Sequence, residues 1–88
     1  MHRNEFTDTL ALEGFQTLVT VTREPNSSLD VHTHPFEAKA LVLAGGLTIT
    51  CAGVEQAYGP GQVFHLPALQ PHSERYGPQG VEYLVGRK

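Results

Sequence analysis

Only one of the 88 residues is a cysteine, Cys51, so no disulfide can form within the chain. A chain this short buries only about 60–65% of the surface that it exposes when unfolded. Domains of this size are commonly stabilised by a bound metal or by association with a second copy. Cys51 lies in an apolar segment, residues 47–52, which favours a buried, unreactive thiol. A lone cysteine and no recognisable secretory signal together predict a reducing, cytoplasmic location.

Positive charge is also scarce, since six basic residues face nine acidic ones and the formal net charge is −3. No basic stripe is present, which argues against a nucleic-acid partner. Long apolar runs are missing too. The longest, residues 40–44, is far too short to span a bilayer, so we expect no membrane partner.

Nine glycines and six prolines are spread along the chain as turn signals rather than gathered in a linker. The segments between them are four to eight residues long, which is typical of β-strands. The expected strands are Thr17–Arg23, residues 47–51, Val54–Tyr58, residues 62–66 and residues 81–85. The pair Ala52-Gly53 between two of them predicts a hairpin turn.

Residues 37–44 are ambiguous, because they contain good helix formers and are followed by Gly45, a plausible helix stop. Short strands at this regular spacing, however, are typical of a sandwich or barrel. We therefore predict a strand here as well, and an all-β fold with residues 1–88 forming a single domain.

Histidines form the most informative pattern. His32 and His34 are two residues apart, so in a strand both side chains point to the same face. Imidazole is a ligand for zinc, iron, nickel and copper. His72 follows Pro67 and Pro71, which restrict the backbone before it. Taken singly, each histidine is more often a surface or core residue than a metal ligand.

In combination these residues resemble the two sequence motifs of the cupin superfamily. The first motif corresponds to His32-Thr33-His34 with Gly45, and the second to Pro60-Gly61, an apolar strand, Pro67 and then His72. The resemblance covers about residues 30–74. It implies a small, single-domain RmlC-like jelly-roll barrel, or double-stranded β-helix, of about eight short strands. A divalent transition metal (Fe, Ni, Mn or Zn) would be bound near one mouth by His32, His34 and His72.

The chain departs from the family pattern at the usual carboxylate ligand. The spacing places that ligand at position 38, where this chain has alanine, and Glu37 lies one residue early. In a regular strand this shift turns Glu37 to the opposite face, whereas a β-bulge near Pro35 would bring it back. Glu37 is thus either a fourth ligand or a solvent-facing residue. His65 is more readily structural than a ligand.

Three protein ligands leave coordination positions open, as in catalytic metal sites. We therefore expect a metal-dependent dioxygenase or isomerase acting on a small polar molecule. The alternative is a non-enzymatic metal- or ligand-binding module of the sensor or storage type, and a metal-free module is a third possibility. A carboxylate or tyrosine near the metal would favour the enzyme. We also expect a homodimer, formed through residues 6–12 or Thr17–Arg23.

Overall fold

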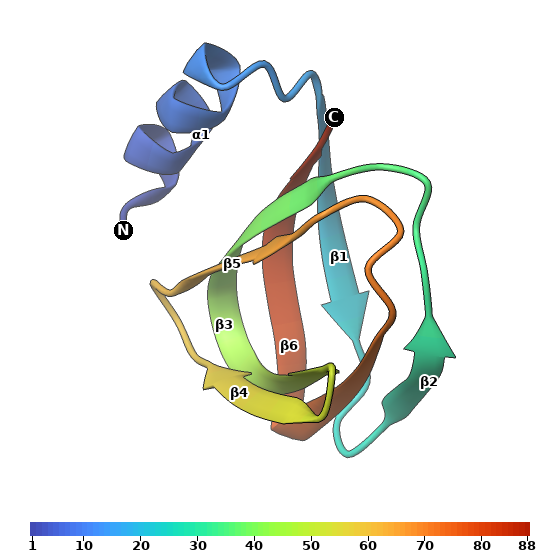
Figure 1. Cartoon of the computed structure of the whole chain (residues 1–88). Coiled ribbons are helices and arrows are strands. Elements are labelled where there is room, and N and C mark those ends of the chain that lie inside the picture. The colour runs from blue at the N-terminus through green and yellow to red at the C-terminus, as the bar shows by residue number, and fades with distance from the viewer.

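The computed structural model describes all 88 residues and contains one helix and six strands (Figure 1). In chain order these are α1 (Arg3–Leu12), β1 (Thr17–Arg23), β2 (Ser28–His32), β3 (Ala38–Cys51), β4 (Val54–Tyr58), β5 (Val63–Leu66) and β6 (His72–Arg87). The β-rich fold is confirmed, and β1 and β4 have the predicted bounds. The helix was not predicted. It is also too short and too polar to cross a membrane.

Two long strands form the centre of the sheet. β3 has 14 residues and β6 has 16, and they pair antiparallel over most of their lengths. β6 also pairs with β1 and β2, and β3 with β4 and β5. Each long strand bends and takes the place of two short ones, so these six strands correspond to the eight short strands that we expected. Figure 1 shows the strands curving around a common interior. The segment 37–44, ambiguous in sequence, lies mainly in β3 and is a strand as predicted.

The bend in β3 depends on glycine. The pairing of β3 with β6 shifts register on either side of Gly45, between Val42 and Ala44 and again between Gly45 and Leu47. Gly45 has a φ of +72°, and a Cβ atom there would lie 2.1 Å from the carbonyl oxygen of Gly80. A side chain at position 45 is therefore excluded both by its dihedral angle and by the close approach of the two backbones.

The apolar side chains form two clusters. The larger contains eleven buried residues inside the barrel, among them Phe64, Tyr76 and Tyr83. The smaller lies between α1 and the outer face of the sheet, where Phe6 and Leu10 are 0% and 1% exposed. Residues 6–12 were one of our two candidate dimer interfaces. Phe6 and Leu10 are buried within the chain, so Leu12, which is 89% exposed, is the large apolar residue that this segment can still offer to a partner.

The predicted hairpin is confirmed between β3 and β4. Ala52 and Gly53 have φ values of +50° and +78°. Positive φ at both central residues is the type I′ geometry that matches the twist of paired strands.

Candidate metal centre

Four side chains converge at one end of the barrel. They are His32 at the end of β2, His34 just after it, and His72 and Glu74 at the start of β6. One potential ligand atom from each lies within 4.8 Å of the others. His32 is paired with His72 in the β2–β6 register, which explains why residues 40 positions apart in sequence meet here. His72 and Glu74 are two apart in a strand and thus share the inward face.

Hydrogen bonds fix how two of the imidazoles are oriented. His32 Nδ1 lies 2.7 Å from the carbonyl oxygen of Asp30, and His72 Nδ1 lies 2.9 Å from that of Gln70. A carbonyl oxygen can only accept, so each Nδ1 carries the proton and donates it. In a neutral ring this leaves the Nε2 lone pair free, the arrangement by which backbone groups orient metal-binding histidines.

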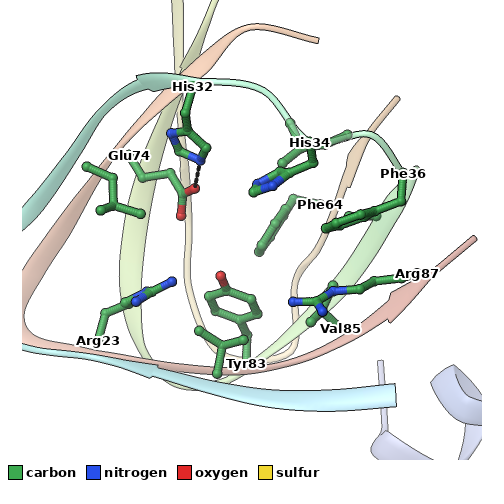
Figure 2. A pocket seen from close by; sticks show the side chains of 13 residues that line it. Arg23, His32, His34, Phe36, Phe64, Glu74, Tyr83, Val85 and Arg87 are labelled. Atoms are coloured by element: carbon green, nitrogen blue, oxygen red, sulfur yellow. Dashed lines mark ion pairs between the residues drawn. The ribbon is translucent and has the colours of Figure 1, made fainter. Parts of the chain in front are cut away.

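These lone pairs point at a carboxylate. Glu74 Oε2 lies 3.3 Å from His32 Nε2 and 3.4 Å from His72 Nε2 (the His32–Glu74 contact is drawn in Figure 2). Glu74 is 7% exposed, and its Oε1 accepts a hydrogen bond from the Tyr76 hydroxyl. His72 Nε2 is buried and has no hydrogen-bond partner. A buried polar atom left unpaired is costly, so the group of acceptors calls for a cation between them.

A divalent ion satisfies this requirement better than a proton. Two ligand atoms each about 2.1 Å from one ion lie about 3.0–3.4 Å apart, which matches the two Nε2–Oε2 distances. Protonation is opposed at His34, because burial and then the neighbouring charges of His32 and His72 lower its pKa. The residues present therefore fit a metal held by three imidazoles and one carboxylate.

The structure places Glu37 elsewhere. Its carboxylate pairs with His65, with Oε2 and Nε2 2.5 Å apart, and both side chains are partly exposed. Ala38 is 5% exposed and faces the barrel interior. This is the outcome that strand alternation favours: position 38 points inward, and Glu37 points out. Neither Glu37 nor His65 belongs to the group of four.

Glu74 was missed in the sequence analysis. Its signal was present, because His72-Ser73-Glu74 repeats the two-residue spacing of His32-Thr33-His34. The carboxylate that is absent from position 38 thus comes from β6 instead. What the sequence does not reveal is that β6 starts at His72 and that its first residues lie beside β2.

A cavity of about 70 Å³ opens beside the four residues. Its walls are largely aliphatic and aromatic, with Val21, Leu29 and Phe64 among the lining residues. Figure 2 shows the Tyr83 hydroxyl pointing across this space toward the histidines. Burial and then the charge of Glu74 raise the pKa of Tyr83 to about 12, against an opposing effect of Arg23. Tyr83 therefore keeps its proton at neutral pH.

The comparisons with known proteins identify the family. A family model described as a cupin domain matches residues 19–82, a range that includes all four converging residues. The chain belongs to the cupin family, as its two histidine motifs indicated. No curated protein matches the sequence.

Solved structures with the same fold are diverse. An RmlC-like cupin from Shewanella frigidimarina is 18% identical, with a TM-score of 0.69 over 81% of this chain and 64% of the other. The lyase DddQ from Ruegeria pomeroyi, named a DMSP lyase, is 25% identical, with a TM-score of 0.74 over 81% and 36%. An oxalate decarboxylase mutant from Bacillus subtilis is 21% identical, with a TM-score of 0.76 over 93% and 23%. The chain thus spans 64% or less of the length of these three proteins, and the likeness concerns the fold.

Proposed function

We infer that this cupin binds one divalent transition metal through His32, His34 and His72, with Glu74 as a fourth ligand. We further infer that it is a metal-dependent enzyme, an oxygenase or isomerase, acting on a small polar molecule. The observation that carries the proposal is the buried, unpartnered His72 Nε2, aimed with a second imidazole lone pair at a buried carboxylate.

The surroundings of the site support an enzyme over a binding module. A carboxylate is among the converging groups, and a protonated tyrosine faces the cavity, the two features that we expected to distinguish a catalytic site. A bound metal would supply Lewis-acid chemistry to a substrate oxygen. Tyr83 can donate a hydrogen bond, or its proton, to a substrate oxygen that gains negative charge. Tyr76 holds Glu74 in place through its hydroxyl, and eight of the 13 residues that line the cavity are hydrophobic.

The metal site is tested by comparing His72→Ala with His65→Ala. Purified protein is stripped with a chelator, dialysed against Fe(II), Mn(II), Ni(II) or Zn(II), and analysed for metal content. We expect about one ion per chain in the wild type and in His65→Ala, and none retained in His72→Ala, because His65 lies outside the group of four. Stoichiometric metal in His72→Ala would refute the site.

Catalysis is tested on the loaded protein with a panel of small enediols, catechols and hydroxy- or ketoacids. Dioxygen uptake and NMR of the products distinguish oxygenation from isomerisation. We expect turnover in the loaded wild type and none in stripped protein or in His72→Ala. A loaded chain that binds members of the panel without turnover would support the non-enzymatic module, a function consistent with the small size of the cavity.

A further inference from the structure

Two arginines that line the cavity have no acidic partner. Arg23 ends β1 and Arg87 ends β6, and neither forms an ion pair. By contrast, Lys39 pairs with Glu13 and Arg75 with Glu55 on the surface. In a chain with more acidic than basic residues, unpaired guanidinium groups at one cavity require an explanation.

Arg87 is held firmly, and one of its polar atoms is unsatisfied. Its guanidinium carbon lies 4.8 Å from the centroid of the Phe36 ring, a cation–π contact that restricts the side chain. Its Nε is buried and has no hydrogen-bond partner. A planar, fixed guanidinium with a free donor is the group that recognises carboxylates in a bidentate manner.

The arrangement across the cavity is polarised. Figure 2 shows the Arg23 and Arg87 side chains on the side of the cavity opposite His32 and His34. Tyr83 lies between the two arginines. Glu74 is the only acidic residue among the 13 that line the cavity. Two arginines and a divalent ion would outweigh this single carboxylate by three positive charges, so the loaded cavity would attract an anion strongly.

We propose that the ligand of this cavity is a small carboxylate that carries a second oxygen function, a class that includes short dicarboxylates, hydroxyacids and ketoacids. The carboxylate lies beside the Tyr83 hydroxyl in the field of Arg23 on one side and Arg87 on the other, and the second oxygen faces the metal centre. Val21, Leu29 and Val85 line the same cavity and contact the short carbon chain between the two ends. An uncharged sugar or catechol would leave both guanidinium groups without a counterion. The inference rests on the proposed metal site for the second oxygen, but the arginine side of the cavity can be examined separately.

The test uses malonate, a short dicarboxylate, and malonamide, its uncharged counterpart. Both are titrated by calorimetry into Zn(II)-loaded protein whose metal content is measured before and after. The variants are Arg23→Gln, Arg87→Gln and Arg87→Lys, with Arg75→Gln as the control because Arg75 pairs with Glu55 outside the cavity. Circular dichroism establishes that each variant is folded. Arg23 is exposed, so Arg23→Gln is the substitution least able to disturb folding.

We expect malonate to bind and malonamide to bind at least tenfold more weakly. Arg23→Gln and Arg87→Gln should each weaken malonate at least tenfold, Arg87→Lys less, and Arg75→Gln less than twofold. Equal binding of the two probes, or arginine variants that bind malonate as the wild type does, would overturn the carboxylate assignment while leaving the metal site intact.

If no metal is retained, the proposed function fails. Carboxylate binding by Arg23 and Arg87 is then tested on the metal-free chain. There, NMR of the arginine Nε–H groups during a malonate titration should show shifts at Arg23 and Arg87 and none at Arg75. Absence of those shifts would overturn the inference independently of the metal.

Discussion

Positions 38 and 74 show how a candidate site can keep its set of donor groups while the carboxylate comes from a different strand. The cupin motif predicts a carboxylate at position 38, yet the residue there is a buried alanine. Glu74 supplies a carboxylate from β6, two residues after His72 and hydrogen-bonded to Tyr76. The resulting group of three imidazoles and one carboxylate could hold a metal ion and has the same donor types as the motif predicts.

This exchange predicts opposite outcomes for two glutamates. Glu74→Gln removes the negative charge with little change of shape and should weaken metal binding by more than tenfold, or about 1.4 kcal/mol. Glu37→Gln should change affinity by less than tenfold, because Glu37 pairs with His65 on the outside of the barrel. Calorimetric titration of stripped protein with Ni(II) or Zn(II) measures both. A loss in Glu37→Gln as large as that in His72→Ala would show that Glu37 is a ligand.

The three histidines of the candidate site predict how metal binding depends on pH. An imidazole must be neutral to bind a metal, and the ordinary pKa of histidine is about 6.5. Bound metal should therefore stay constant from about pH 7.5 to pH 6.5 and fall steeply below about pH 6. The pKa of His34 is lowered by burial and by its histidine neighbours, so His34 remains competent at lower pH than an isolated histidine. Metal content after dialysis at each pH measures the curve, and a constant content down to about pH 5 would contradict it.

At the scale of elements, the two long strands and the helix decide where the site lies. β3 and β6 extend through both ends of the barrel, and the start of β6 carries His72 and Glu74 to the end of β2. The helix α1 covers Leu41 and Leu84 on the outer face of these strands, away from the cavity. The helix therefore does not cover the candidate metal centre.

Replacing Gly45, the glycine at the bend of β3, should lower the stability of the fold. Gly45→Ala and Gly53→Ala both place a Cβ at positive φ, which destabilises each by about 1–2 kcal/mol. Only at Gly45 does the Cβ also collide with backbone, since nothing lies within 4 Å of a Cβ at Gly53. We therefore expect Gly45→Ala to lower the free energy of unfolding by about 3 kcal/mol or more. Urea denaturation measures the free energy of unfolding of both variants. Equal losses of stability would show that β3 and β6 can move apart at Gly45 without an energetic cost.

At the scale of the whole molecule, a free strand edge remains. β1 pairs with β6 on one side only, and its Leu18 is 48% exposed. An unpaired edge in a small barrel is a surface on which a second copy can dock. Because Phe6 and Leu10 in residues 6–12 are buried within the chain, we favour Thr17–Arg23 as the predicted dimer interface.

We accordingly predict a homodimer that depends on β1. Light scattering at micromolar concentration should give twice the chain mass for the wild type and the chain mass for Leu18→Lys, because a lysine on an edge strand opposes pairing. Leu12→Lys is the matched control, since Leu12 is 89% exposed on α1 and should leave the dimer unchanged. A monomeric wild type would refute the prediction.

Local patterns in the sequence were sufficient to determine the strands Thr17–Arg23 and Val54–Tyr58, the Ala52-Gly53 hairpin and the histidine pair at 32 and 34. Turn chemistry and two-residue alternation act between neighbours, so they can be recognised without the fold. The helix Arg3–Leu12 escaped notice because only Phe6 and Leu10, four residues apart, mark its buried face.

Only the tertiary structure decided which residues from distant parts of the chain lie together at the candidate site and the cavity. Glu74 becomes a candidate ligand only because the β2–β6 register places His32 opposite His72. Arg23 and Arg87 line one cavity because β1 and β6 are neighbours in the sheet, although the antiparallel register places Arg23 opposite Val81 and Arg87 opposite Thr17, at the two ends of the pair. Pairing between distant strands depends on the closure of the barrel and the bend at Gly45, and no short stretch of sequence contains that information.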